Sequence, residues 1–398
     1  MREKGKKIPA VTPEMEILLG SIGGGESREI PFAEILKKEI DWTKLKEIAL
    51  YHKVLPLLYI QLKKLDESLV PQEEMAQIKS IYKHNALRNI RLAQVLHRVI
   101  ELLSGDGIEV IAFKGPALAV QAYEDLSLRT FEDLDLLVHT GDFCKIYDVL
   151  TAAGYRSNFT LTQRMKRCWM RFRRDFQFSQ DFIVIDFHHQ ISQGSKRISL
   201  KEKTWRNRCT VEILFRKAAT LSPEHSLIAL CVHGTKDRWN SLRIMADIGG
   251  LISRHPDLNW KTLVSDAEEI GCLRMVRVGL RLSRHICGVV LPEEILESAQ
   301  KDRKAGKLAS KYLHRLFSDE KAEIGKYYEI PAMLKSLDSF GFRITYLIHF
   351  IFTPTPLDWL AIPLPGILYP LYYLVRPLRL FFNLVSRLFR SGLGARQS

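Results

Sequence analysis

Several common enzyme motifs are missing from this sequence of 398 residues. It contains no Gly-x-Ser-x-Gly elbow, no Gly-x-Gly-x-x-Gly and no Walker loop, which argues against serine hydrolases, dinucleotide-binding folds and P-loop enzymes. The six cysteines show no Cys-x-x-Cys pair and no matching histidine spacing. This argues against a zinc site and favours free thiols in a reducing compartment. The cysteines are Cys144, Cys168, Cys209, Cys231, Cys272 and Cys287.

A signal peptide is also missing, because no apolar stretch of the required length follows the charged start, so we expect a cytoplasmic protein. The chain is 46% hydrophobic and 26% charged, a composition typical of a globular protein with two or three packed units. Its net charge of +14 indicates an anionic partner: a membrane, a nucleotide or a nucleic acid.

The most informative pattern present is an Asp-x-Asp pair, Asp133 and Asp135, in the apolar run 133–138. In a strand both carboxylates point to one face, about 7 Å apart along it. Two like charges this close raise each other's pKa unless a cation lies between them, and Mg²⁺ is a hard cation that carboxylates bind well. The alternative is a strand end at which water solvates both acids.

A strand followed by a helix is predicted just upstream of this pair. Residues 108–113 are apolar, Gly115 allows a tight turn, and Pro116 suits the first position of a helix that continues to Tyr123. A helix N-terminus favours anions, and Lys114 adds a positive charge, so this turn is a candidate phosphate site. A plain strand-to-helix connection is the alternative.

A third carboxylate, Asp186, lies in the apolar run 181–189. We expect a strand there, with Asp186 and His188 on one face and Ile185 and Phe187 on the other. Burying an aspartate in such a strand is costly unless it is paired or bound to metal, so Asp186 is expected to converge on the same site. The alternative is a strand-end aspartate that is hydrogen-bonded to a loop. Only one of His188 and His189 can face the acids.

The order of these elements resembles that of the polymerase-beta-like nucleotidyltransferase superfamily. More closely, the stretch from Phe113 to Val138, together with 154–155, 185–188 and 233–239, resembles bacterial proteins described only as an uncharacterised nucleotidyltransferase family. The resemblance covers roughly residues 40–260. One departure is the turn Lys114-Gly115-Pro116, which offers no hydroxyl where the superfamily commonly has a serine.

The resemblance implies an α+β fold with a polymerase-beta-like nucleotidyltransferase core, a small mixed sheet with flanking helices. This core is expected at 106–215, between a helical N-terminal region at 1–105 and a helical domain at 216–330 that completes the cleft. An apolar and basic C-terminal tail is expected at 331–398. Helical periodicity supports helices within 42–62, 73–103 and 222–318.

The resemblance also implies functional roles. Asp133, Asp135 and Asp186 are the expected catalytic residues and the ligands of Mg²⁺ or Mn²⁺. The expected nucleotide-binding residues are Lys114, Gly115, Arg129, His233 and Lys236. For Arg129 an ion pair with Glu132 or Asp125 is an equal alternative. For His233, Lys236 and Asp247, helix capping and ion pairs between helices are the alternative to lining the cleft.

Two further segments carry partner hypotheses. Residues 164–174 interleave cations with Trp169 and Phe172, which suits a nucleic-acid site or a strand with a solvated basic face. The tail is apolar from 344 to 389, but its prolines and short uncharged stretch argue against a membrane-spanning helix, which needs about 20 apolar residues. Its later arginines have helical spacing and predict a basic amphipathic helix, which would either lie on an anionic membrane or cover a protein surface. These arginines are Arg376, Arg379, Arg387 and Arg390.

Together these patterns predict a metal-dependent nucleotidyltransferase. It would transfer an NMP group from a nucleoside triphosphate to an acceptor hydroxyl or phosphate and release pyrophosphate. Membrane affinity would favour an acceptor in surface polysaccharide biosynthesis, at the inner face of the membrane. The alternatives are a catalytically silent membrane-associated scaffold and a nucleic-acid-binding protein.

Overall fold

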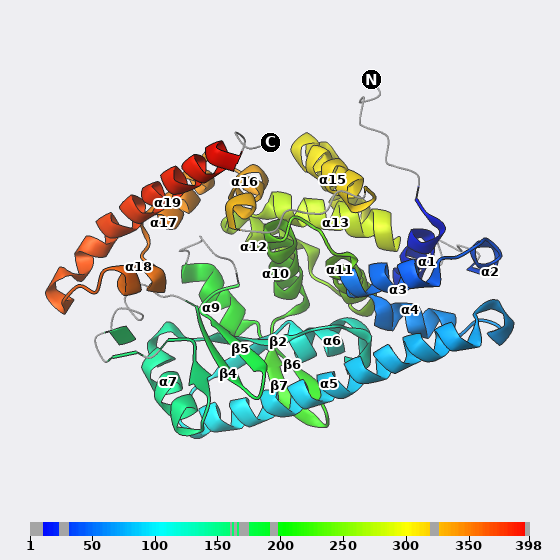
Figure 1. Ribbon diagram of the computed structural model, residues 1–398, viewed down its shortest axis with the longest axis horizontal. Coiled ribbons are helices and arrows are strands. Elements are labelled where there is room, and N and C mark those ends of the chain that lie inside the picture. Colours follow the sequence, from blue (N-terminus) through cyan, green and yellow to red (C-terminus); the bar gives the residue numbers. More distant parts are fainter. Residues whose placement is uncertain are drawn as a thin grey trace.

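The computed structural model describes residues 11–23, 32–159, 161–162, 165–166, 175–191, 198–318 and 326–394. Most of the basic segment 164–174, including Trp169 and Phe172, lies outside these residues, as does Cys168. Figure 1 shows a sheet with the N-terminal helices at one end, a group of helices above it and the C-terminal helices at the other end. The predicted α+β class is confirmed.

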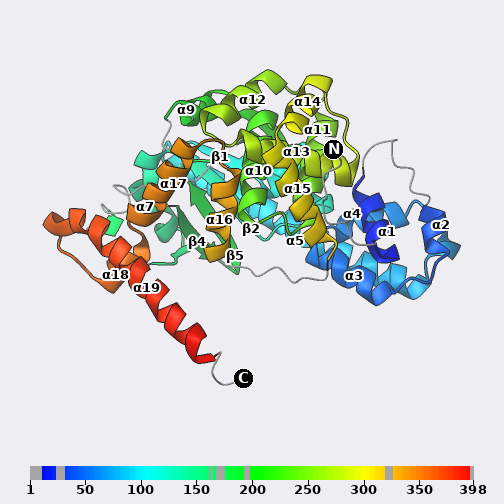
Figure 2. The same ribbon diagram turned by 90° about the horizontal axis from the view of Figure 1, so that it is seen from above.

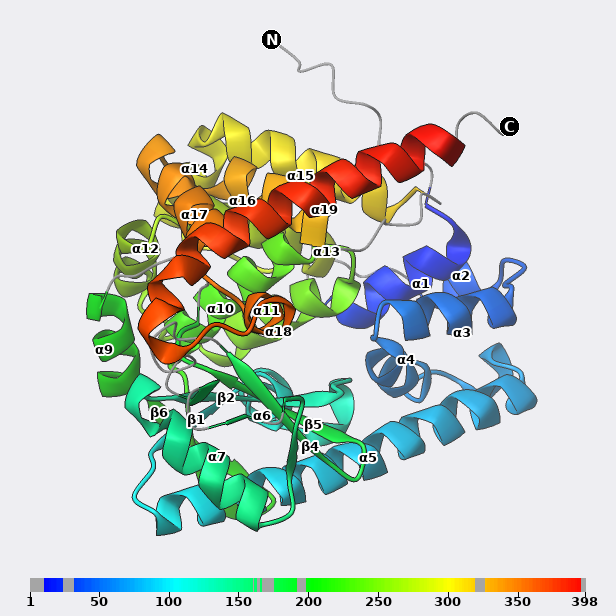
Figure 3. The same cartoon turned by 60° about the vertical axis from the view of Figure 1, so that its left-hand side comes forward.

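The N-terminal region is helical, as predicted. Its helices are α1 (Pro13–Ile22), α2 (Phe32–Leu36), α3 (Trp42–Tyr51), α4 (Leu55–Leu62) and α5 (Gln72–Gly105), with a 3-10 turn at Glu67–Leu69. The Asp41 side chain caps α3 by accepting from the Lys44 N–H, and Pro56 occupies the first turn of α4. The long helix α5 runs beneath the sheet (Figures 1 and 3).

In the described part of the chain the sheet contains seven strands, in the order β3-β4-β5-β2-β1-β7-β6. They are β1 (Val110–Phe113), β2 (Asp133–Val138), β3 (Arg156–Ser157), β4 (Phe176–Gln180), β5 (Ile183–His188), β6 (Cys209–Ile213) and β7 (Arg216–Thr220). Strand β2 is central, since it pairs with β1 in antiparallel and with β5 in parallel orientation. Strand β7 joins β1 in parallel, so the sheet continues beyond the predicted core boundary at 215. The proposed domain boundaries remain predictions.

The two faces of the sheet differ in chemistry. Leu134, Leu136 and Val138 of β2 pack in one cluster with Leu96 of α5 and Ile146 of α7 (Phe143–Ala152). Leu137 packs on the opposite face, with neighbours that include Phe113 of β1 and Ala229 of a helix above the sheet. The period of two therefore sets an apolar face against α5 and leaves the other face for Asp133 and Asp135.

The upper helices form the second helical region, as the periodicity of 222–318 predicts. They are α10 (Pro223–Lys236), α11 (Leu242–Arg254), α12 (Trp260–Glu269), α13 (Leu273–Cys287), α14 (Glu293–Lys301) and α15 (Arg303–Leu316). Two other helices connect this region to the sheet: α6 (Gly115–Tyr123), which follows β1, and α9 (Ile198–Arg206), which precedes β6. Short 3-10 turns are formed by Leu126–Leu128 and Thr140–Asp142.

The C-terminal region consists of α16 (Lys326–Ser336), α17 (Phe340–Phe352), α18 (Pro356–Ala361), a 3-10 turn at Gly366–Leu371 and α19 (Tyr372–Gly394). In the described part of the chain, no helix combines the length and the apolar character needed to cross a membrane. The predicted basic helix is present as α19. Within this helix Arg376 and Arg379 do not face outward, because both side chains turn inward to the buried Asp358 of α18.

Candidate active site

The candidate site is built on two neighbouring parallel strands, β2 and β5. Their register places Asp135 directly beside Asp186, and Asp133 beside Val184. Ligand atoms of Asp135, Asp186 and His188 all lie within 4.8 Å of one another. The structure thus brings two of the three predicted acids together, with His188 as the histidine that faces them.

Asp135 is the most enclosed of the acids, with 6% of its side chain exposed. Its Oδ1 accepts hydrogen bonds from Lys114 Nζ at 3.1 Å and from His188 Nε2 at 2.9 Å. Burial by itself would raise the pKa of Asp135, but the two cations outweigh it and hold this pKa well below its usual value. Asp135 is therefore ionised throughout the physiological pH range.

His188 links Asp135 to a further acid. Its Nδ1 lies 3.4 Å from Asp175 Oδ2, just before β4. Burial would lower the pKa of His188, but the hydrogen bonds to Asp135 and Asp175 raise it to about 9. The imidazole is thus a cation at neutral pH. The sequence pattern placed one histidine on this face, but the pairing with Asp175 depends on the antiparallel contact of β4 with β5.

Asp133 and Asp186 behave differently from Asp135. Burial raises the pKa of each carboxyl, and the charge of Asp135 adds to this. Asp186 accepts a hydrogen bond of 2.7 Å from Gln177 Nε2 on the neighbouring strand β4, which partly offsets the increase. These two carboxyls consequently hold a proton more readily than Asp135 does. A divalent cation would relieve the same repulsion.

The turn between β1 and α6 brings Lys114 onto Asp135. Lys114 has φ 57° and ψ −153°, and Gly115 has φ 44°, so two successive residues have positive φ. A Cβ atom on Gly115 would lie 3.4 Å from the Asp133 carbonyl oxygen. Glycine is favoured here both by the close approach and by the positive φ. The predicted strand, turn and helix are present.

Arg129 lies close to these residues but has a different partner from the ones predicted. Its Nε lies 3.1 Å from both carboxylate oxygens of Asp247 on α11, and its Nη2 lies 3.1 Å from Oδ2. Glu132 pairs instead with Lys53, and Asp125 accepts from the Ser127 N–H. Arg129 therefore forms an ion pair, as one of the two alternatives predicted, but its partner is Asp247 and not Glu132 or Asp125.

The C-terminal end of α10 faces the acidic strands. His233 Nε2 lies 3.2 Å from Asp237 Oδ2. Burial lowers the pKa of His233 well below its usual value, and the nearby charges of Lys114 and Arg243 add to the effect. Lys236 lowers it further, whereas the charge of Asp135 raises it, so His233 lies within electrostatic reach of the acids and Lys236 lies close to His233. Asp247 is bonded to Arg129 and to the Tyr123 hydroxyl, which donates to Asp247 Oδ1 at 3.0 Å.

Arg243 is a site residue that the sequence patterns did not reveal. Its Nη1 donates to the Thr130 carbonyl oxygen at 2.8 Å, and its charge acts on Asp133, Asp237 and Asp247. It lies in the first turn of α11, beside the capping residue Ser241. A cation at the start of a helix interacts unfavourably with the helix dipole. This unusual position is the feature of the sequence that could have indicated a role for Arg243.

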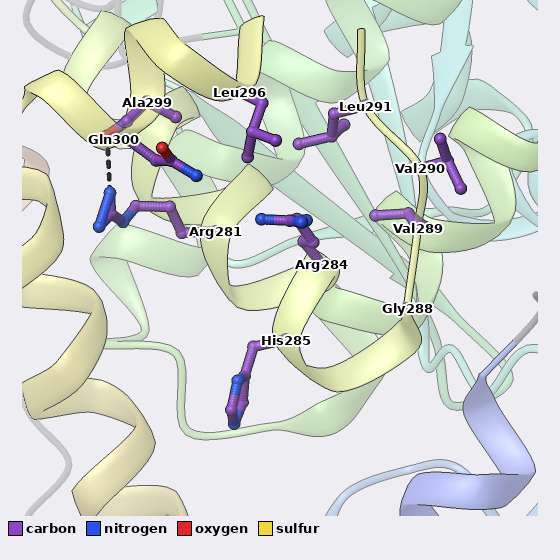
Figure 4. A pocket seen from close by; sticks show the side chains of 10 residues that line it. All are labelled: Arg281, Arg284, His285, Gly288, Val289, Val290, Leu291, Leu296, Ala299 and Gln300. Carbon is purple, nitrogen blue, oxygen red and sulfur yellow. Dashed lines mark hydrogen bonds between the residues drawn. The ribbon is translucent and has the colours of Figure 1, made fainter. Parts of the chain in front are cut away.

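A separate pocket of about 670 Å³ opens beside α13 and α14 (Figure 4). Arg281, Arg284 and Leu296 are among its lining residues, and Arg281 donates to the Ala299 carbonyl oxygen. None of the predicted site residues lines this pocket.

The site thus combines carboxylates from adjacent strands with a lysine at a helix N-terminus. The family model described as "uncharacterised nucleotidyltransferase" matches residues 38–288, and the chain belongs to this family. Family membership supports nucleotidyl transfer activity and implies a nucleotide substrate, and nucleotidyltransferases generally use divalent metals.

Among solved structures, an antigenic nucleotidyltransferase-like protein from Paracoccidioides brasiliensis is similar to this chain. The two are 17% identical, the alignment covers 53% of this chain and 92% of that one, and the TM-score is 0.32. No curated protein matches the sequence.

Proposed function

We propose that this protein is a metal-dependent nucleotidyltransferase that transfers an NMP group from a nucleoside triphosphate to an acceptor hydroxyl or phosphate. The observation that carries the proposal is the register of Asp135 with Asp186 across the parallel strands β2 and β5. Two carboxylates from separate strands within 4.8 Å form a donor set for a divalent cation, on the face that Lys114 and the end of α10 also approach.

The side chains present fit a hard divalent cation. Asp135 and Asp186 supply oxygen donors, and Asp133 is the third acid on the same face, which suits Mg²⁺ or Mn²⁺. The His188 nitrogen lies close enough to join them, but it would have to lose its proton first, since hydrogen bonds to Asp135 and Asp175 raise the pKa of His188 to about 9. Lys114 and His188 now neutralise Asp135 and would share it with the cation. When bound, the metal would neutralise phosphate charge and lower the pKa of the attacking hydroxyl.

The chain's own residues would position the reactants. Lys114 and the free N–H groups at the start of α6 are the proposed phosphate contacts, with Gly115 allowing close approach. An acceptor oxygen attacks the α-phosphorus, its bond to phosphorus forms, the bond to the β-phosphate oxygen breaks, and pyrophosphate leaves. Asp186, whose pKa burial raises, is the proposed base for the acceptor proton.

The remaining residues proposed to support nucleotide binding are His233 and Lys236 at the end of α10, and Arg129. Arg129 would contribute from within its ion pair with Asp247, by holding α11 and Arg243 against the site. For the acceptor, we propose a precursor of surface polysaccharide, met at the inner face of the membrane. The exposed apolar C-terminal helices support this location.

The test is nucleotide binding by the full chain with Mg²⁺, with Mn²⁺ and with EDTA, across the four nucleoside triphosphates. Asp135→Asn and Asp186→Asn should abolish the metal-dependent part of the affinity. The exposed Asp257→Asn is the matched control and should retain it. If the folded protein has no metal-dependent nucleotide affinity, the enzyme proposal fails and a silent scaffold is favoured. Pyrophosphate release then reports turnover once an acceptor is supplied.

A further inference from the structure

An unusually apolar surface lies on the C-terminal helices. Of the 22 large apolar side chains that are exposed in the described residues, 15 lie between Phe340 and Phe382. They occupy α17, α18, α19 and the turn before α19, where Ile367 is 87% exposed. Monomeric soluble proteins rarely expose so many together, so this surface indicates an interaction site. Figure 2 shows α19 extending away from the sheet and the helices above it.

The same helices are firmly attached on their inner side. Trp359 and Tyr372 are buried in one cluster with Phe176 and Phe178 of the catalytic sheet. The Tyr372 hydroxyl donates to the Ile362 carbonyl oxygen at 2.8 Å and accepts from the Leu364 N–H. The outward apolar side chains are thus held in place relative to the sheet that carries the acids.

The charges of this segment are of one sign. Residues 340–398 contain six arginines and a single acid, Asp358. Asp358 is fully buried and accepts from Arg376 and Arg379, so it presents no negative charge to the outside. Beyond this pair, helix α19 continues through a sequence with Arg387 and Arg390 and no acid. The apolar surface therefore lies on a segment whose uncompensated charge is positive.

We propose that this surface, residues 340–382, docks on the surface of an anionic phospholipid bilayer. Apolar side chains would enter the boundary between headgroups and acyl chains. The arginines of residues 340–398 that do not pair with Asp358 would attract the lipid phosphates. A second copy of the chain suits the surface less well, because a two-fold contact would set this basic segment against itself. No described helix is fit to span the bilayer, so the contact is peripheral.

The role of this docking rests on the proposed function: it would bring the acids to an acceptor in the membrane. The docking itself needs neither metal nor nucleotide. Its links to the catalytic sheet through Trp359 and Tyr372 would hold the site at a fixed distance from the bilayer.

The experiment is co-sedimentation of the full chain with vesicles of phosphatidylcholine alone, and with vesicles of equal parts phosphatidylcholine and phosphatidylglycerol. We expect binding to the anionic vesicles that weakens with salt. The variant Ile367→Asp/Leu374→Asp replaces two exposed apolar side chains and should reduce binding by at least about tenfold. Phe215→Asp, at an equally exposed apolar position on the β6–β7 turn, should bind like the wild type.

Three results would overturn the docking proposal. They are absence of sedimentation with both vesicles, equal binding by the Ile367→Asp/Leu374→Asp variant, and a lipid-free dimer that this variant dissociates. Asp135→Asn separates the two proposals, since it should lose metal-dependent nucleotide affinity yet bind vesicles normally. The Ile367→Asp/Leu374→Asp variant should show the opposite pattern.

Discussion

Arg129 and Asp247 form a buried ion pair in which both carboxylate oxygens are bonded. The Arg129 side chain is 3% exposed and the Asp247 side chain 0%, and the pair joins the segment before β2 to helix α11. It thereby connects the sheet with the helices above it, next to the acids.

Breaking this pair from one side should be costly, because Asp247 would remain as an uncompensated buried charge. We expect Arg129→Met to lower the free energy of unfolding by about 3–5 kcal/mol in urea titrations. Lys38→Met breaks the exposed ion pair with Glu16 and should cost at most about 1 kcal/mol. Adding Asp247→Leu to Arg129→Met should recover much of the loss, and equal losses for the two ion pairs would contradict this.

Lys114 and a divalent cation should compete for Asp135, since Lys114 Nζ already lies 3.1 Å from Asp135 Oδ1. Removing the ammonium in Lys114→Met should therefore strengthen Mg²⁺ binding in the absence of nucleotide, by about tenfold or more. The same variant should weaken nucleotide affinity, because a phosphate contact is lost. Isothermal titration with each ligand measures both effects, and Lys145→Met, at an exposed lysine of α7, is the control. If Lys114→Met lost affinity for both Mg²⁺ and nucleotide, Lys114 and the cation would not compete for Asp135.

His52 should make stability fall in acid. It is 4% exposed, and burial lowers its pKa from 6.5 to about 4. The unfolded chain takes up the proton first, so the stabilisation by neutral His52 is complete above pH 6.5 and is lost as pH falls toward 4. The loss amounts to about 3 kcal/mol. Urea titrations across this range should show a shallower pH dependence in His52→Gln, with His84→Gln on α5 as the control. The same slope in both variants would refute the assignment.

Close packing at Gly279 of α13 should forbid a side chain. A Cβ atom there would lie 2.5 Å from Cys231 Sγ and 2.8 Å from a ring carbon of Trp239. Gly279→Ala should lower the melting temperature, at a cost of about 1–3 kcal/mol for the overpacked core. Gly105→Ala, where nothing lies within 4 Å, is the matched control and should be neutral or slightly stabilising. A normal melting temperature for Gly279→Ala would show that α10 and α13 can separate.

The sequence predicted the strands of the acids well, because alternation in 133–138 and 183–188 is a strong local signal. The β4–β5 and β6–β7 hairpins were not predicted. Their turns place Asp181-Phe182 and Leu214-Phe215 at positive φ, where Asn-Gly or Asp-Gly is the usual signal. The partner of Arg129 was also missed, since tertiary packing rather than local pattern brings Asp247 to it.

The parallel pairing of β2 with β5 has a consequence for the order of folding. Asp135 and Asp186 are adjacent in space, yet α7, β3 and β4 are among the described elements that lie between them along the chain. Closing so long a loop costs entropy before any contact between the strands repays it. A growing chain that has emerged only to β2 has no two-strand acid site, however well its helices have formed. During refolding, affinity for a divalent cation should therefore appear at the same time as β2–β5 pairing. The rate at which this affinity appears would measure the rate of that pairing.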